Sequence, residues 1–246
     1  MLPSDLRACL FDLDGVLTDT AAVHAAAWKR MFDEFLRERA AREGGPFVPF
    51  DPATDYPRYV DGKRRADGTR AFLASRGIRL PEGSPDDPPG ALTVRGLGAR
   101  KNDLVLRLLE ERGVTVFPDA VAFVRAIRGR GLRTAVVSSS ANTAQVLRVA
   151  GLTGLFDARV DGVTAQERNL PGKPAPDMFW EGARALNVEP GRAAVFEDAL
   201  AGVAAGRAGG FALVVGVDRV GGGHGEALRE HGADIVVDDL GELLET

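Results

Sequence analysis

The sequence predicts an α/β fold, in which a Rossmann-like parallel sheet forms the core and an α-helical cap domain is inserted after the first strand. From residue 118 onward, short continuous apolar runs alternate with helical patterns, which is typical of a parallel sheet covered by helices on both faces. The first apolar run, residues 8–11, is separated from that regular part by helical patterns and no convincing strand. We therefore predict a core domain of residues 1–19 and 114–246 and a cap domain of residues 20–113.

Five strands are predicted from short apolar runs that are followed by polar residues or glycine. They comprise residues 8–11, 134–137, 193–196, 212–215 and 235–237. In the core, helices are predicted around the apolar positions Val121, Val124 and Ile127, and before a stop at Gly151. Right-handed crossovers through such helices keep the strands parallel.

The predicted cap contains helical segments joined by loops that are rich in proline and glycine. One helix follows Thr20, a residue able to cap it, and carries apolar side chains at helical spacing. Another covers residues 99–112 and ends at Gly113. Residues 44–57 and 81–98 are predicted to be loops, and loops of such length are often functional.

Composition and charge restrict the partners of the protein. The formal net charge is only −4, so neither nucleic acid nor an anionic membrane surface is predicted as a partner. No apolar stretch is long enough to span a membrane, and the start lacks the pattern of a signal peptide. The single cysteine, Cys9, lies in an apolar run and is predicted to be a buried side chain. We predict a cytoplasmic protein and expect a monomer.

Polar side chains follow three of the predicted strands, and a lysine lies in a loop that precedes the third of them. In an open parallel sheet, ligands bind beyond the carboxyl ends of the strands, so these side chains are predicted to converge. They are Asp12, Asp14, Ser138, Ser139, Ser140, Lys173, Glu197 and Asp198. Four carboxylates in one cleft would repel one another, and a divalent cation such as Mg²⁺ removes that repulsion.

Each residue type in this set has a task in phosphoryl transfer. Asp12 is predicted to be the nucleophile, and Asp14 to pass a proton to the leaving oxygen and take it back. Lys173 is expected to neutralise charge on the phosphoryl oxygens, while a hydroxyl donates a hydrogen bond to them. A calcium-binding loop is disfavoured, because its sixth and twelfth positions would be Leu17 and Val23 rather than glycine and glutamate.

Taken separately, these motifs have ordinary structural explanations. The aspartates suit a turn after a strand, the serines suit a strand-end loop or a helix cap, and Lys173 suits a solvated surface. The pair Glu197-Asp198 suits the first turn of a helix, where the dipole favours acidic residues. We favour the catalytic interpretation because all four features are placed at the same edge of the predicted sheet.

At these residues the sequence resembles the haloacid dehalogenase superfamily of phosphohydrolases and phosphomutases. All four motifs of that superfamily have counterparts in the expected order, so the resemblance covers the whole core. The counterparts are Phe11-Asp12-Leu13-Asp14-Gly15-Val16-Leu17-Thr18-Asp19-Thr20, Val137-Ser138-Ser139-Ser140, Lys173-Pro174-Ala175-Pro176-Asp177 and Phe196-Glu197-Asp198-Ala199-Leu200-Ala201-Gly202.

Within the superfamily, Thr18-Asp19-Thr20 followed by His24 and Trp28 is similar to the β-phosphoglucomutases. The resemblance implies a sugar phosphate substrate, with β-D-glucose 1-phosphate and glucose 6-phosphate interconverted through β-glucose 1,6-bisphosphate and a phosphorylated aspartate. It implies the catalytic residues Asp12 and Asp14, the Mg²⁺ ligands Asp12, Asp14 (through its backbone carbonyl), Asp198 and Glu197 (through water), and the substrate- or phosphate-binding residues Ser138, Ser139, Lys173, Gly62, Arg65, Lys101, Asn102, His24 and Trp28.

Several positions depart from that pattern. Ala141 stands where a lysine is common, Ala199 where a small polar residue is common, and Lys63-Arg64 where an apolar–serine pair is familiar. A sugar-phosphate phosphatase of the same fold, in which water attacks the phosphoenzyme, therefore stays open. A dehalogenase is disfavoured because Asp14 supplies a general acid that halide displacement does not need. A non-catalytic metabolite-binding protein is a further alternative.

The cap residues have alternatives of their own. Arg65 and Lys101 also suit a solvated helix face, since long basic side chains are usually solvated. His24 and Trp28, one helical turn apart, also suit plain packing within the cap.

Overall fold

The computed structural model describes residues 2–244, which form two compact units. The first unit contains residues 2–19, Gly62–Arg64 and 114–244, and the second contains Thr20–Asp61 and Arg65–Gly113. The short segment Gly62–Arg64 therefore packs with the first unit, whereas the sequence had placed it in the cap.

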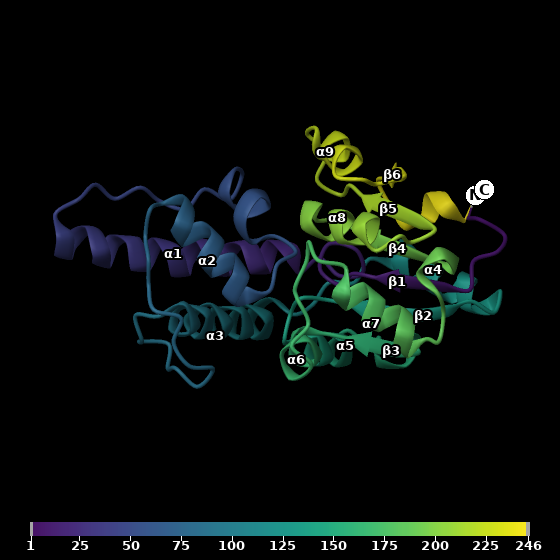
Figure 1. The fold of residues 1–246 in the computed structure, drawn as a ribbon, viewed down its shortest axis with the longest axis horizontal. Coiled ribbons are helices and arrows are strands. Elements are labelled where there is room, and N and C mark those ends of the chain that lie inside the picture. Colours follow the sequence, from purple (N-terminus) through teal and green to yellow (C-terminus); the bar gives the residue numbers. More distant parts are fainter. Residues whose placement is uncertain (1, 245–246) are drawn as a thin grey trace. The chain divides into compact units, whose positions relative to one another are not determined.

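The first unit is built around a parallel six-stranded sheet with the order β3-β2-β1-β4-β5-β6 (Figure 1). The strands are β1 (Ala8–Phe11), β2 (Arg133–Val137), β3 (Ala158–Val160), β4 (Ala193–Glu197), β5 (Leu213–Val217) and β6 (Ile235–Val237). The parallel pairing confirms the predicted fold class. Since β1 lies between β2 and β4, the strands that precede Asp12, Ser138 and Asp198 are neighbours. The sequence did not predict β3, because this short strand carries the exposed, charged Arg159 at its centre.

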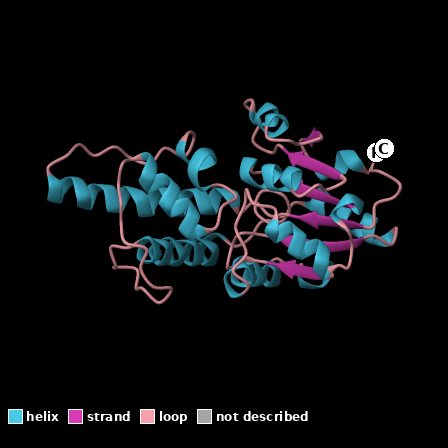
Figure 2. Cartoon of the chain, viewed as in Figure 1, coloured by secondary structure: helices cyan, strands magenta, loops and turns pink. Residues whose placement is uncertain are grey.

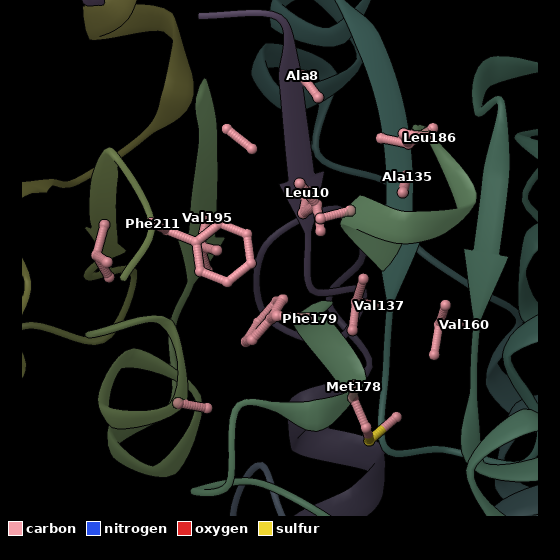
Figure 3. Close-up of a cluster of buried hydrophobic side chains, with 14 of the residues drawn as sticks. Ala8, Leu10, Ala135, Val137, Val160, Met178, Phe179, Leu186, Val195 and Phe211 are labelled. Carbon is pink, nitrogen blue, oxygen red and sulfur yellow. The ribbon is translucent and has the colours of Figure 1, made fainter. Parts of the chain in front are cut away.

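Helices cover both faces of the sheet (Figure 2). They are α4 (Pro118–Gly129), α5 (Thr143–Val149), α6 (Gly162–Glu167), α7 (Asp177–Ala185), α8 (Leu200–Ala208) and α9 (His224–Glu230), with 3-10 turns at Thr153–Leu155, Pro190–Arg192 and Leu240–Leu243. On one face, α7 packs on β1, β2 and β3 and contributes Phe179 to the buried cluster that also contains Leu10 and Val195 (Figure 3). On the other face, the Phe123 ring of α4 meets the Phe11 ring, with their centroids 6.2 Å apart.

The side chains of β1 point alternately to the two faces of the sheet, which explains why the strand is apolar at every position. Ala8 and Leu10 belong to the cluster under α7, while Phe11 points to the opposite face and stacks on Phe196 with centroids 4.6 Å apart. Both faces are buried, so every position must be apolar. Cys9 is fully buried as predicted, and loss of hydration raises the pKa of its thiol to about 12, so the thiol stays protonated at neutral pH.

The two segments that flank the insertion run side by side within the first unit. Thr18 and Val116 form an antiparallel bridge. The Asp19 amide donates to the Thr115 carbonyl at 2.9 Å, and the Phe117 amide donates to the Leu17 carbonyl at 3.0 Å. The chain that leaves the turn after β1 is therefore hydrogen-bonded to the chain that returns from residue 113.

The second unit is helical, as the sequence predicted for most of its length. Its elements are α1 (Ala21–Glu43), a π-helical turn (Tyr56–Val60), α2 (Arg65–Ser75) and α3 (Val94–Arg112). Its core is aromatic: Phe32 lies 5.2 Å from Trp28, 5.4 Å from Phe50 and 4.1 Å from Phe72 between ring centroids. Within residues 2–244, no helix is long and apolar enough to cross a membrane.

Both loop predictions in the second unit need correction at their ends. The predicted loop 44–57 ends at a π-helical turn that begins at Tyr56. The predicted loop 81–98 ends earlier, because α3 begins at Val94 rather than at residue 99. Thr93 explains this start, since its side-chain hydroxyl accepts a hydrogen bond from the Gly96 amide at 2.9 Å.

Candidate active site

A buried ion trio lies at the carboxyl edge of the sheet. The Lys173 ammonium is 2.6 Å from Asp12 Oδ1 and 2.6 Å from Glu197 Oε1. It also donates to the Val137 carbonyl at 3.3 Å, and it lies 4.8 Å from the centre of the Phe179 ring. Since these partners belong to the ends of β1, β4 and β2, one cation ties together three neighbouring strand ends. The sequence predicted that Lys173 converges on this edge, but not that it contacts both carboxylates.

Burial and charge act in opposite directions on this trio. Loss of hydration raises the pKa of Glu197 to about 7, although Lys173 and the Ala199 amide stabilise its charged form. Burial likewise raises the pKa of Asp12, against the attraction of Lys173. For Lys173, burial disfavours the ammonium, but the two carboxylates outweigh that effect and raise its pKa above the usual value. Lys173 is therefore charged, and two carboxylates compete for its single positive charge.

The chain turns sharply after β1, at the predicted catalytic residues Asp12 and Asp14. The Asp14 amide donates to Asp12 Oδ2 at 3.0 Å, so Lys173 and the chain itself hold one oxygen each of the Asp12 carboxylate. The turn closes on itself, because the Leu13 carbonyl accepts hydrogen bonds from the amides of Leu17 at 2.9 Å and Thr18 at 3.0 Å. Asp14 is half-buried on this closed turn, two residues beyond the strand.

Two glycines make room for the acidic pair that follows β4. Gly15 has φ +86°, and a Cβ added there would lie 1.8 Å from Asp198 Oδ2, so the Asp198 carboxylate rests directly over the Gly15 backbone. A Cβ on Gly202 would lie 1.6 Å from Glu197 Oε1. Glu197 Oε2 in turn accepts a hydrogen bond from the Ala199 amide at 2.7 Å. The positions of both carboxylates thus depend on glycine at these two sites.

The serines after β2 lie at the same edge. Ser138 is almost fully buried, and its hydroxyl accepts a hydrogen bond from the Ser140 amide at 3.1 Å. The residue before it, Val137, is the one whose carbonyl contacts Lys173. The Ser139 hydroxyl donates to the Gly62 carbonyl at 2.7 Å, which ties the segment Gly62–Arg64 to this loop.

A second group of predicted residues comes together inside the second unit. Lys101 Nζ lies 2.9 Å from His24 Nδ1 and 4.9 Å from the centre of the Trp28 ring. Burial, followed by the charges of Lys101 and Arg65, holds the pKa of His24 well below its ordinary value, so the imidazole is neutral. Its Nδ1 is then free to accept a hydrogen bond from the Lys101 ammonium. Lys101 is buried, which excludes the solvated helix face considered for it.

Arg65 belongs to the same positively charged environment at the start of α2. Burial is the main cause that lowers the pKa of its guanidinium, and the nearby charge of Arg95 adds to that effect. Asp103 opposes both. Asn102 is half-buried and follows Lys101 on α3. A cluster of partly buried cations of this kind is a surface suited to an anion.

Comparison of the sequence with protein-family models identifies the family of this protein. The model for haloacid dehalogenase-like hydrolases matches residues 6–210. The chain belongs to the haloacid dehalogenase-like hydrolase family. The matched region contains the whole catalytic edge described above.

Similar proteins match this chain over nearly its full length. A Mycobacterium bovis protein named beta-phosphoglucomutase is 59% identical over 244 residues, which are 99% of this chain and 93% of that relative. A Bacillus subtilis protein of the same name is 29% identical over 97% of this chain and 92% of its own length. The crystal structure of a Clostridium difficile beta-phosphoglucomutase matches with a TM-score of 0.75 and 25% identity, covering 97% of this chain and 93% of that one. The chain is an enzyme of the haloacid dehalogenase superfamily and resembles the beta-phosphoglucomutases within it.

The predicted site residues of this family member form two groups, one in each unit. The first unit brings together Asp12, Asp14, Ser138, Ser139, Lys173, Glu197, Asp198 and Gly62, and the second unit brings together His24, Trp28, Arg65 and Lys101. Sequence reasoning missed Arg219, in the loop after β5, and His224, the first residue of α9. His224 Nε2 lies 2.7 Å from the Asp198 carbonyl. The signal that identified Asp12 and Glu197, polar residues after a parallel strand, is also present at Asp218-Arg219.

The carboxylates of the site do not form a metal-binding cage by themselves among the described residues. Among the described residues 2–244, no three or more His, Cys, Asp and Glu side chains form a set able to hold a metal ion. A metal ion at this edge would therefore need ligands of other kinds, such as backbone carbonyls, water or substrate oxygens.

Proposed function

We propose that the protein interconverts β-D-glucose 1-phosphate and glucose 6-phosphate through β-glucose 1,6-bisphosphate and a phosphorylated Asp12. The observation that carries the proposal is the Asp12 carboxylate, fixed 2.6 Å from a buried lysine and preceding Asp14 on a closed turn. Support for the substrate comes from the Mycobacterium bovis relative, which shares 59% identity over 93% of its length and is named for this reaction. The second unit serves as the cap in this proposal.

Mg²⁺ fits the residues at this edge. The proposed ligands are the carboxylates of Asp12 and Asp198 and the backbone carbonyl of Asp14, with Glu197 acting through water. Mg²⁺ prefers one or two carboxylates, several waters and substrate phosphate oxygens, so it needs no cage of three side chains. The Asp198 carboxylate lies over Gly15 in space that a Cβ would fill, which leaves it beside the catalytic turn. When bound, the ion supplies positive charge that offsets the negative charge of the phosphoryl oxygens.

The chain's own residues account for the rest of the reaction. A carboxylate oxygen of Asp12 attacks phosphorus, and the bond from phosphorus to the sugar oxygen breaks as the aspartyl-phosphate forms. Asp14 donates a proton to the departing sugar oxygen, and in the other half-reaction it accepts the proton of the attacking sugar hydroxyl. Lys173 and the hydroxyl of Ser138 stabilise the negative charge on the transferred phosphoryl group. Each catalytic cycle therefore regenerates the phosphorylated Asp12 and the original protonation state of Asp14.

The cationic cluster of the second unit suits the phosphate that does not react. A bisphosphate carries one phosphate at the nucleophile and a second one that must be held. Arg65 offers a planar guanidinium for bidentate binding, and Lys101 offers a point charge that the neutral His24 orients at 2.9 Å. We include Trp28, Asn102, Gly62 and Ser139 among the residues that shape the sugar phosphate site.

A single assay tests this function against the phosphatase alternative. The protein is incubated with Mg²⁺, β-glucose 1-phosphate and a catalytic amount of β-glucose 1,6-bisphosphate, and glucose 6-phosphate and free phosphate are followed together. We expect glucose 6-phosphate to exceed free phosphate, because a sugar hydroxyl rather than water attacks the phosphoenzyme. Predominant release of phosphate would show that the protein is a phosphatase of the same fold.

Replacement of Asp14 by alanine should slow turnover of the sugar phosphate about 100-fold or more, the usual scale for loss of a general acid. Alanine removes the carboxyl group but keeps the backbone amide that donates to Asp12 Oδ2 at 3.0 Å. The nucleophile therefore stays in place. Steady-state kinetics measure the effect, and a kcat within a factor of about two of the original would contradict the assigned role.

Replacement of Gly15 by alanine should weaken the binding of Mg²⁺ by displacing Asp198. The new Cβ would lie 1.8 Å from Asp198 Oδ2, so the carboxylate must move away from the turn. We expect the Mg²⁺ concentration for half-maximal activity to rise about 10-fold or more, as for altered metal-supporting residues elsewhere. A titration of activity with Mg²⁺ measures the shift.

Gly44→Ala is the matched control for that variant. Gly44 has φ +76° and nothing within 4 Å of its added Cβ, whereas Gly15 has a similar φ of +86° and a severe clash. Both variants carry the cost of a left-handed alanine, about 1 kcal/mol. Only Gly15→Ala should change the Mg²⁺ requirement. An equal requirement in both variants would remove Asp198 from the proposed ligand set.

The cytoplasmic location and the monomeric state that the sequence suggested stay predictions. Gel filtration with light scattering of the purified protein measures the second of them directly.

A further inference from the structure

Arg219 lies in the loop after β5 and reaches back to the catalytic motif. Its guanidinium donates through Nη2 to Asp119 Oδ2 at 2.6 Å and to the Val16 carbonyl at 3.4 Å. The guanidinium carbon lies 3.8 Å from the centre of the Phe117 ring, a cation–π contact. The side chain is only 15% exposed. Three segments that are distant in the sequence therefore meet at one arginine.

The partners of Arg219 surround the turn that carries Asp14. Val16 is fully buried and lies two residues after Asp14 on the closed turn. Phe117 stands on the returning segment, and its amide donates to the Leu17 carbonyl at 3.0 Å. Arg219 thus contacts both the turn, at the Val16 carbonyl, and the segment that pairs with it, at Phe117.

Asp119 holds the guanidinium in this orientation. Asp119 Oδ2 accepts hydrogen bonds from Arg219 at 2.6 Å and from the Leu240 amide at 3.0 Å. Burial disfavours the Asp119 carboxylate, but these hydrogen bonds and the charge of Arg219 outweigh it and lower the pKa. The pair is therefore ionised at neutral pH, and the carboxylate, in the first turn of α4, is also held by the Leu240 amide after β6.

Packing alone does not account for an arginine here. Among the described residues, Arg219 Nε is buried without a hydrogen-bond partner. An unsatisfied buried donor is costly, and a well-packed apolar side chain would fill the space without that cost. An apolar side chain could not supply the Nη2 hydrogen bond to the Val16 carbonyl at 3.4 Å or the ion pair with Asp119 at 2.6 Å.

We propose that Arg219 is a positioning residue for Asp14, because it fixes the backbone of the catalytic turn through Val16 and its paired segment through Phe117. This inference rests on the proposed function, in which Asp14 protonates the departing sugar oxygen. If the turn could shift, Asp12 would stay in contact with Lys173, but Asp14 would move away from the departing sugar oxygen that it protonates. Loss of Arg219 should therefore impair proton transfer and spare the nucleophile.

Two phosphoryl donors separate a loss of proton transfer from damage to the nucleophile. β-Glucose 1,6-bisphosphate has an alkoxide leaving group that needs a proton, whereas acetyl phosphate releases acetate, which is a stable anion at neutral pH. For Arg219→Met we expect phosphorylation of Asp12 by the bisphosphate to slow about 10-fold or more, the scale of a displaced catalytic group. Phosphorylation by acetyl phosphate should change by less than about two-fold. Rapid acid quench and mass spectrometry of the Asp12 acyl-phosphate measure both rates.

Companion variants define what the result means. Asp14→Ala should show the same selectivity more strongly, and Asp119→Asn should show it more weakly while perturbing the fold less than Arg219→Met. Arg128→Gln is the matched control, since Arg128 also pairs with a carboxylate in this unit, Asp157 at 2.8 Å, but lies away from the catalytic turn. It should leave the ratio of the two rates unchanged.

The outcomes are distinguishable. Selective loss with the bisphosphate in Arg219→Met and Asp119→Asn supports the positioning role. An equal fall of both rates, or no change in either, overturns it, because damage to folding or to the nucleophile does not discriminate between donors. Failure of the original protein to form any acyl-phosphate would instead reject the proposed function itself.

Discussion

Replacement of Asp12 by asparagine should abolish turnover, with a fall in kcat of at least about 10⁴-fold, because the neutral amide cannot form the phosphoryl ester. The acyl-phosphate should also disappear from acid-quenched protein examined by mass spectrometry. The side chain keeps its size at the end of β1, so the active site should keep its shape. Persistence of an acyl-phosphate elsewhere in the chain would assign the nucleophile to another residue.

The cost of this substitution in stability should be modest. Asp12 accepts one hydrogen bond on each oxygen, from Lys173 at 2.6 Å and from the Asp14 amide at 3.0 Å. Asparagine keeps one acceptor and points an N–H group at the other donor, which costs about 1–3 kcal/mol. Asp19→Asn is the matched control, because Asp19 is an exposed carboxylate of the same motif and its loss should leave kcat unchanged. Chemical denaturation then separates lost chemistry from lost folding.

Replacement of Lys173 by methionine should affect stability and activity together, since the lysine is the shared counter-ion of two buried carboxylates. Its ammonium lies 2.6 Å from Asp12 Oδ1 and 2.6 Å from Glu197 Oε1, and its side chain is 0% exposed. Removing one partner of a buried ion pair costs about 3–5 kcal/mol, because the remaining charge loses its compensation. We also expect kcat to fall about 10³-fold, the upper range for loss of one group that stabilises the transition state.

A second substitution separates the two consequences. In Lys173→Met combined with Glu197→Gln, one of the two carboxylates left without their cation is replaced by a neutral amide, so we expect part of the lost stability to return while kcat stays low. Lys29→Met is the control for loss of an exposed pair: Lys29 lies 2.9 Å from Asp33 but is 42% exposed. That change should cost less than about 1 kcal/mol. A double variant as unstable as Lys173→Met would show that the charge on Glu197 is not the cause.

The pattern of apolar runs was sufficient to predict most of the sheet. β1 and β6 begin and end at the predicted residues, while β2, β4 and β5 differ from the prediction by one or two residues at their ends. A strand buried on both faces must be apolar at every position, so it is visible in the sequence. β3 is an edge strand whose Arg159 faces solvent, and nothing in its composition distinguishes it from a loop.

The cap helices show where local signals fail. The start of α3 at Val94 depends on the Thr93 hydroxyl, which accepts from the Gly96 amide, but the surrounding proline and glycine residues predict a loop. The grouping of Gly62–Arg64 with the first unit depends on contacts such as that of Ser139 with the Gly62 carbonyl at 2.7 Å. Such contacts join residues that are far apart in the sequence, so no local sequence pattern predicts them.

The sequence by itself determined which residue types stand at the carboxyl ends of the strands, because the same apolar runs that identify the strands also mark where they end. It therefore determined the fold class, and it pointed to Asp12, Asp14, Ser138 and Glu197 as neighbours. Only the tertiary structure decided that Lys173 bridges two carboxylates and that Arg219 donates a hydrogen bond to the Val16 carbonyl on the turn after β1. Those contacts join residues 161 and 203 positions apart, and their geometry follows from the packing of the whole unit rather than from any local propensity.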